Sequence, residues 1–319
     1  MRPEILKTLE KQIDSPGFVR TWLDRFYEPE EIDILVRFNE AGRVHKSVET
    51  DWIVDVKILE RLLKRGVLKR NKMGNPVPAD FHTRYDIWAV FEGFKDLPEE
   101  IRNQLNQWEL DAYIRRHKAD VDTLVSGSIP GPDRVIPRYL LLDETHAVLD
   151  EADQFYLWPC NCRSMIQACS KPVYACIRFE NSQGQGYEIS REKAKQIVRD
   201  ANKKGLMQSG ELGRDEKGKL TGAVCNCCPD CCFPHLLAKE RGVEKLWPVS
   251  RYLARLVEEN CNTCGLCAKR CPFHAFGFDR KKEKKSRLSF DPDQCRGCGL
   301  CAETCPGEAI RMESIDSLY

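Results

Sequence analysis

The 319-residue chain lacks cysteine over its first 159 residues, although it holds 17 cysteines in all. It also lacks any apolar run approaching the ~20 residues that span a bilayer, and its start, MRPEILKTLE, lacks the basic-then-apolar order of a signal peptide. The charge is balanced, at 50 Lys and Arg against 49 Asp and Glu, which argues against a general polyanion binder. These absences predict a cytoplasmic protein without a membrane partner.

Motifs for nucleotide chemistry are absent as well. The sequence contains no G-x-G-x-x-G, Walker loop or nucleophile elbow, so nothing in it predicts a nucleotide or flavin fold. Because a reducing cytosol opposes structural disulfides, clustered cysteines there favour metal or redox chemistry. We therefore interpret the N-terminal half as an ordinary globular region and expect the chemistry in the C-terminal half.

Two copies of one cysteine pattern close the chain. CNTCGLCAKRCP begins at Cys261 and CRGCGLCAETCP begins at Cys295, and each is C-x2-C-x2-C-x3-C-P. Three thiolates in such a tight loop can bind three irons of a cubane, while the fourth iron takes a cysteine from elsewhere. Zinc knuckles are the alternative, but tandem motifs of four cysteines with this prolyl ending rarely hold zinc. The pattern predicts two [4Fe–4S] clusters.

Residues 255–312 resemble the bacterial dicluster ferredoxins, a resemblance carried by these two motifs. It implies a βαββαβ-like fold in which the last cysteine of each motif serves the other cluster. One cluster would then be bound by Cys261, Cys264, Cys267 and Cys305, and the other by Cys295, Cys298, Cys301 and Cys271. Gly265 and Gly299 lie inside the loops, where the backbone must approach the cluster.

The segment between the two motifs, AFGFDRKKEKKSRLSFDP, predicts a β-hairpin with Arg280 to Arg287 at its turn. Its tip carries six basic residues against Glu283. An exposed basic loop beside a cluster could steer an acidic redox partner, and it could equally be a solvated turn.

Nine further cysteines lie upstream, in WPCNCRSMIQACSKPVYACIRF and AVCNCCPDCCF. They are Cys160, Cys162, Cys169, Cys176, Cys225, Cys227, Cys228, Cys231 and Cys232. Three interpretations remain open: one or two additional [4Fe–4S] clusters, a zinc ion with four thiolates, or a thiol–disulfide site. The side chains of adjacent cysteines diverge, so we do not expect all five of the second group on one metal. Arg163 could donate to a cluster or lower a thiol pKa, or it could lie at the surface.

Helical patterns surround these cysteines. Residues 190–205 predict a helix with Ser190 as N-cap and Gly205 at its end, and FPHLLAKERG and SRYLARLVEEN predict two more. The combination of CNCR at 160–163, ISREKA at 189–194, GL at 205–206 and CNCCPDCC at 225–232 resembles a family of large ferredoxin-like iron–sulfur proteins from anaerobes. The chain departs from it at Met207 and Gln208, where relatives tend to show a histidine.

The N-terminal region predicts a winged-helix-like domain. Helices are expected to end at Gly42 and Gly66, followed by two strand-like runs within residues 67–93. The second helix and its exit carry a basic face: Lys57, Arg61, Lys64, Arg65, Lys69 and Arg70. Residues 1–100 nevertheless hold 17 basic and 19 acidic side chains, so we favour a protein–protein module over nucleic-acid binding.

The sequence as a whole predicts an α+β multidomain protein. The expected parts are winged-helix-like residues 1–95, a helical connector at 96–157, a helical cysteine-rich middle domain at 158–254 and a dicluster ferredoxin at 255–319. We expect an electron carrier or oxidoreductase subunit of anaerobic metabolism that serves a redox partner protein. The alternatives are an iron–sulfur sensor that regulates transcription and a reductase whose middle cysteines hold a cluster with an open site.

Overall fold

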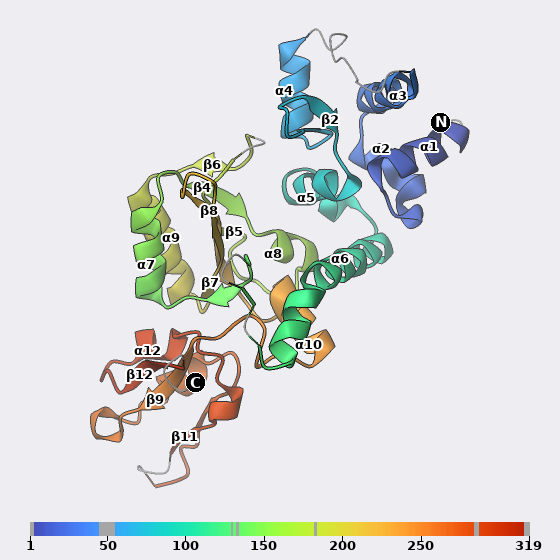
Figure 1. The fold of residues 1–319 in the computed structure, drawn as a ribbon. Helices are drawn as coiled ribbons and strands as arrows, with labels where there is room; N and C mark the ends of the chain where they lie inside the picture. Colours follow the sequence, from blue (N-terminus) through green and yellow to red (C-terminus); the bar gives the residue numbers. More distant parts are fainter. Residues whose placement is uncertain are drawn as a thin grey trace. The chain divides into compact units, whose positions relative to one another are not determined.

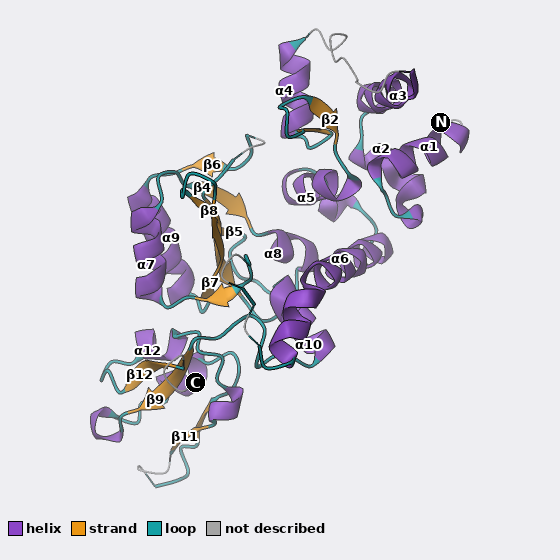
Figure 2. Cartoon of the chain, in the orientation of Figure 1, coloured by secondary structure: helices purple, strands orange, loops and turns teal. Residues whose placement is uncertain are grey.

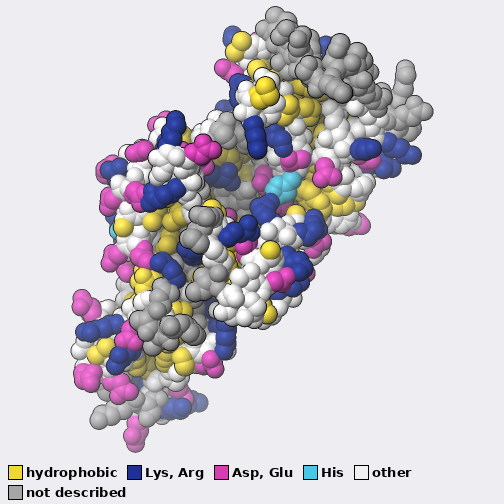
Figure 3. All heavy atoms as spheres, in the orientation of Figure 1, with side chains coloured by type: hydrophobic (Ala, Val, Ile, Leu, Met, Phe, Trp, Pro, Cys, Tyr) yellow, Lys and Arg dark blue, Asp and Glu magenta, His cyan; other side chains and the backbone are white. Residues whose placement is uncertain are grey.

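The computed structural model describes residues 3–44, 55–128, 130–131, 134–181, 184–283 and 287–315 (Figure 1). The chain divides into two compact units, one of residues 1–102 with 181–185 and one of residues 103–180 with 186–319. Among the described residues, no helix is long and apolar enough to cross a membrane. On the face drawn in Figure 3, basic and acidic side chains are interspersed, as the balanced composition requires.

The first unit is mainly helical (Figure 2). Its helices are α1 (Pro3–Ile13), α2 (Leu23–Phe26), α3 (Pro29–Val44), α4 (Val56–Lys64) and α5 (Phe81–Phe91), with short 3₁₀ turns at Gly17–Trp22 and Phe94–Asp96. Strands β1 (Leu68–Arg70) and β2 (Pro76–Pro78) form an antiparallel hairpin after α4. Phe26 packs between Phe81 and Trp88, with ring centroids at 5.0 and 4.5 Å, and this aromatic group centres the core.

Both expected helices of this unit are present, and the second ends before Gly66 as predicted, whereas the first continues past Gly42 to Val44. The expected second strand-like run is wrong, because Phe81–Phe91 is a helix. Asp80 caps it by accepting the N–H of Thr83 at 2.8 Å. The buried residues are 81, 84, 85, 87, 88 and 89, and they do not alternate as the residues of a half-buried strand would. The helix–helix–hairpin order fits a winged helix, which stays a prediction.

The basic face of the first unit is partly neutralised by the unit's own acids. Arg61 pairs with Glu28 and Glu30, Arg65 with Glu28, Glu31 and Glu92, and Lys69 with Asp80. Three of the six basic side chains are therefore engaged inside the unit, which weakens the case for phosphate binding.

The second unit contains an antiparallel sheet with strand order β3-β7-β8-β5-β4-β6. The strands are β3 (Arg138–Tyr139), β4 (Tyr156–Pro159), β5 (Tyr174–Arg178), β6 (Tyr187–Glu188), β7 (Met207–Arg214) and β8 (Leu220–Cys227). Helices α7 (Leu142–Glu151) and α9 (Arg191–Lys203) cover one face (Figure 1). Ile177, Phe179 and Val224 pack against them in one core.

The expectation of a helical middle domain is therefore wrong in its main part. Helix α9 forms as predicted, with the Ser190 hydroxyl accepting the N–H of Lys193, and so does α10 (Phe233–Arg241). The long β7–β8 hairpin between them was missed. Its turn is fixed by Asp215, whose carboxylate accepts the N–H groups of Lys217 and Lys219, a side-chain turn signal that is present in the sequence. Helix α6 (Glu99–Val125) and the short α8 (Asn161–Ile166) complete the region.

The C-terminal region has the order β9 (Tyr252–Leu256), α11 (Leu266–Arg270), β10 (Phe276–Phe278), β11 (Leu288–Phe290), α12 (Leu300–Thr304) and β12 (Ile310–Ser314). This is the βαββαβ order that the resemblance implied. The β10–β11 hairpin forms as predicted, and residues 284–286 of its tip lie outside the described residues. The helix expected over SRYLARLVEEN is wrong: β9 pairs with β12, burying Ala254 beside Ile310, and this tertiary pairing overrides local helical preference.

Candidate metal centres

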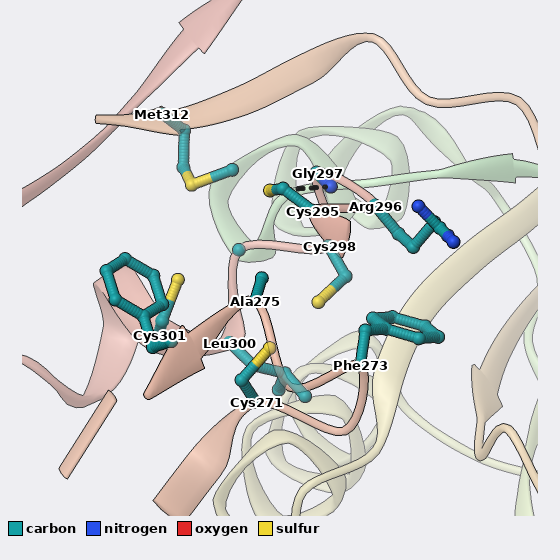
Figure 4. A pocket seen from close by; sticks show the side chains of 12 residues that line it. Cys271, Phe273, Ala275, Cys295, Arg296, Gly297, Cys298, Leu300, Cys301 and Met312 are labelled. Carbon is teal, nitrogen blue, oxygen red and sulfur yellow. Dashed lines mark hydrogen bonds between the residues drawn. The ribbon is translucent and has the colours of Figure 1, made fainter. Parts of the chain in front are cut away.

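The eight C-terminal cysteines gather in two cavities, and each cavity draws on both motifs. Cys261, Cys264 and Cys267 line the first cavity together with Cys305. Cys295, Cys298 and Cys301 line the second together with Cys271, and Figure 4 shows these side chains around it. Each motif therefore supplies three cysteines to one cavity and its last cysteine to the other. The cysteine sets are the same as those that the resemblance implied.

Glycines bring the backbone close to these cavities. Gly265 and Gly299 start α11 and α12 with φ of 74° and 76°. A Cβ on Gly265 would lie 2.7 Å from the Phe278 ring, and one on Gly299 would lie 2.8 Å from a methyl carbon of Leu141. Only glycine combines this backbone conformation with the space available. Each loop can therefore pass close to the cysteines that it carries.

The thiols in these cavities are held in conditions that oppose a free thiolate. Burial, together with the neighbouring cysteines, raises the pKa of Cys267 to about 11 and that of Cys298 to about 12. Burial likewise raises the pKa of Cys301 well above its ordinary value. A bound metal supplies the positive charge that lets such thiols ionise together. Four cysteines per cavity, with backbone N–H groups near Cys295 and Cys305, fit a [4Fe–4S] cluster in each.

Six of the nine middle cysteines form a closed ring in which each thiol contacts two others. In order around the ring they are Cys160, Cys162, Cys232, Cys227, Cys225 and Cys176, which contacts Cys160 again. The sulfurs of Cys227 and Cys232 lie 3.4 Å apart. Cys162 and Cys225 are half-buried and the other four are buried.

The sheet register explains how these cysteines meet. Cys225 and Cys227 are two residues apart on β8 and therefore lie on one face. The β5–β8 register pairs Ile177 with Val224, which places Cys176 opposite Cys225. Cys160 and Cys232 are the N-caps of α8 and α10. Because Ile177 and Val224 face α7 and α9, the ring lies on the opposite face of the sheet.

The other three middle cysteines form a separate trio of Cys169, Cys228 and Cys231. The sulfur of Cys169 lies 3.6 Å from each of the other two, and all three lie within 4.8 Å of one another. Burial raises the pKa of Cys169, but the N–H of Lys171 and the thiol of Cys228 lower it more, so the net shift is downward. The adjacent pairs 227/228 and 231/232 each send one thiol to the ring and one to the trio.

Arg163 lies close enough to both groups of thiols to interact with their charges. The residue is 2% exposed, and its guanidinium donates to the carbonyls of Pro172 and Asn226 and also hydrogen-bonds Cys228. Burial lowers its pKa, but Cys160 and Cys228 raise it more, so the pKa lies above its ordinary value. No carboxylate among the described residues forms an ion pair with it. A buried cation without a counter-charge is costly, so the nearby thiols are its natural anionic partners.

A buried amide network supports Arg163. Gln208 donates to Asn226 at 2.9 Å and accepts from Asn202 at 2.8 Å, and Asn226 donates to the carbonyl of Ala175. Arg270, next to Cys271, donates to Asn202 at 3.0 Å. Gln208, at one of the two positions where relatives tend to show a histidine, is therefore fully buried and hydrogen-bonded.

Sequence reasoning missed Tyr139, which is 1% exposed. Its neighbours in the fold are Met207, Leu300, Phe273 and Cys298 of one cluster, and the ring thiols of Cys227 and Cys232 also act on its phenol. It therefore lies between the second cavity and the ring. Its two-residue strand β3 carried no sequence signal.

The comparisons agree with this geometry for the C-terminal region. The family model of the 4Fe-4S dicluster domain matches residues 260–309, a span that contains both C-terminal cysteine quartets. A comparison with curated proteins found no match. The chain therefore carries a ferredoxin-type iron–sulfur domain at this end, and the cysteine-rich middle region offers at least one further group of residues able to hold a metal.

Proposed function

We propose that this protein is an iron–sulfur electron-transfer protein that exchanges electrons with a redox partner at its first C-terminal cavity and with a metal site in its own middle region through its second. The observation that carries the proposal is the pair of cavities, each lined by four cysteines that come from both motifs. A [4Fe–4S] cluster with four cysteine ligands supplies one-electron transfer and leaves no open coordination position.

The residues around the two cavities differ, and this difference assigns the first cavity to the external partner and the second to the middle region. Cys264 of the first cavity is exposed, so a partner protein can approach it closely. The second cavity is covered by Leu300, Phe273 and Tyr139, with ring centroids of the two aromatics 6.4 Å apart. Tyr139 also meets His235 at 5.9 Å, and His235 follows Cys232 by three residues on α10.

These side chains fill the space between the second cavity and the ring with packed atoms. A continuous packed medium favours electron transfer over a water-filled gap. Arg270 adds a second connection, since it leads from the cavity through Asn202 and Gln208 to Asn226 and Arg163. In this proposal the middle cysteines hold at least one further iron–sulfur centre, because a zinc ion cannot accept electrons, and the protein works beside a partner oxidoreductase.

Matched Cys264→Ser and Cys298→Ser variants of the full chain test the proposal under oxygen-free conditions. Wild-type protein should contain about eight cluster irons in the C-terminal region, and each variant should lose one of two paramagnetic signals on reduction. We further expect Cys264→Ser to slow exchange with an external one-electron donor, and Cys298→Ser to block reduction of the middle site only. Colourless, iron-free wild-type protein would refute the proposal.

A further inference from the structure

We propose that the nine middle cysteines form two distinct metal sites: a ring site that holds at least two bridged thiophilic metal atoms, and a trio site that holds one divalent ion of the zinc class with its fourth position open to an external ligand. This inference goes beyond the proposed function and does not depend on the two C-terminal clusters.

The distances between sulfur atoms separate the two kinds of site. Two thiolates on one tetrahedral zinc ion lie about 3.8 Å apart, because each Zn–S bond is about 2.3 Å long. Ligands of a single ion are therefore all mutual neighbours, whereas ligands of different irons in a cubane are not. Among all described cysteines, only Cys169, Cys228 and Cys231 form a trio with every sulfur within 4.8 Å of the others.

The two C-terminal quartets provide an internal comparison. Their cysteines would bind four different irons, and neither quartet contains three sulfurs that meet this distance limit. The trio meets it, so it has the spacing of ligands on one ion. The described residues place no fourth Cys, His, Asp or Glu ligand within that limit of the trio.

The trio site is also reachable and charge-balanced. Cys169 is half-buried, so its metal could accept a small ligand from solvent. Three thiolates on a divalent ion carry one net negative charge, and Arg163, which hydrogen-bonds Cys228, carries the opposite charge. The unpaired, buried Nε of Arg163 leaves a donor available beside the site. Three protein ligands with an open fourth position are typical of catalytic zinc, and the external ligand would be water or a small thiol.

The ring does not fit a single ion. One tetrahedral ion takes at most four thiolates, and each of those would touch the other three. No three of the six ring thiols lie within 4.8 Å of one another, so they do not have the spacing of ligands on one ion. Six thiolates in this arrangement match two or more metal atoms that share bridging sulfur. Residual negative charge on such a centre would also face Arg163.

Adjacent cysteines supply matched variants for the test. Cys231→Ser changes the trio and Cys232→Ser changes the ring, one position away. Cys228→Ser and Cys227→Ser repeat the comparison at the end of β8. Metal atoms per chain are counted in anaerobically purified full-length protein. Each trio variant should lose one metal atom and each ring variant at least two, while both C-terminal paramagnetic signals persist in all four.

Three outcomes would overturn the proposal. If the two variants of each adjacent pair lose equal numbers of metal atoms, one site uses all nine cysteines. If a trio variant loses four irons, the trio holds a cubane. If no variant loses metal, the middle region holds none. If one pair fails to fold, the other pair still decides. These results are separate from the C-terminal signals, whose absence would count against the proposed function instead.

X-ray absorption at the edge of the trio metal tests the open position in wild-type protein. Its coordination should change from three sulfurs and one light atom to four sulfurs when millimolar 2-mercaptoethanol is added. Four sulfurs before addition, or no change after it, would refute an open position. A confirmed open position would give the middle region a place to bind a small molecule, as the reductase hypothesis requires.

Discussion

Substitution of Gly297 by alanine should destabilise the protein at the second cavity, and by more than the cost of the unfavourable backbone conformation alone. Gly297 has φ of 64°, and an added Cβ would lie 2.1 Å from the carbonyl oxygen of Tyr252 and 2.4 Å from the hydroxyl of Ser250. Gly242 has the same φ of 64°, but an added Cβ there meets nothing within 4 Å. Gly242→Ala is therefore a control that carries only the conformational cost.

The two costs can be separated by magnitude. The left-handed conformation costs a residue with a Cβ about 1–2 kcal/mol, and both variants bear it. Forcing an atom into a packed site adds about 1–3 kcal/mol, which only Gly297→Ala bears. For a unit of this size, that difference corresponds to roughly 2–12 °C in the apparent thermal midpoint.

Thermal unfolding and iron content should be measured together in anaerobic full-length protein. Because Gly297 lies between Cys295 and Cys298, relief of the clash must move the loop that carries both cysteines. We expect Gly297→Ala to unfold at a lower temperature than Gly242→Ala and to retain about four irons fewer, the content of one cubane. If the two variants have equal thermal midpoints and equal iron contents, the backbone of residue 297 does not pass as close to Tyr252 as we infer.

Substitutions at three more positions probe other parts of the chain by chemical unfolding. Asp80→Ala should lower the free energy of unfolding by about 1 kcal/mol, and Asp80→Asn by less, because the amide oxygen can still cap α5. Burial raises the pKa of Asp80, but Lys69 and Thr83 lower it to about 2. The stability that this carboxylate contributes should therefore be lost only as the pH falls from about 4 toward 2. Arg163→Met should cost about 3–5 kcal/mol by breaking a buried charge pairing, with Arg163→Lys intermediate, and equal stability would contradict its role. Burial lowers the pKa of His235 to about 4, so the unfolded chain binds more protons below about pH 6.5 and stability should fall from there toward pH 4; His235→Phe should flatten that slope.

Local sequence predicted those features that a short segment specifies by itself. The spacing of Cys261, Cys264 and Cys267 forces three thiols into one loop, and the motif's repetition at Cys295 predicts a second. The N-cap of Ser190 and the end at Gly205 gave helix α9 correctly, because capping depends on residues within one turn. The β10–β11 hairpin was predictable for the same reason.

Strand pairing over long separations was not predictable. SRYLARL has a helical pattern, yet it is a strand because β12, more than fifty residues later, pairs with it. The β7–β8 hairpin carried a turn signal at Asp215 that local reasoning overlooked. Phe81–Phe91 was misassigned because a short apolar run fits both periods until its burial is known.

The sequence by itself determined that this protein carries two cysteine quartets of ferredoxin type and nine further thiols without a pattern of their own. The division of the nine into a ring and a trio follows from the fold, because the pairing of β5 with β8 brings Cys176 beside Cys225, and the turn after β8 places Cys228 and Cys231 beside the distant Cys169. Cys227 is the last residue of β8 and belongs to the ring, whereas Cys228 lies just beyond the strand and belongs to the trio, so adjacent residues join different sets of distant cysteines.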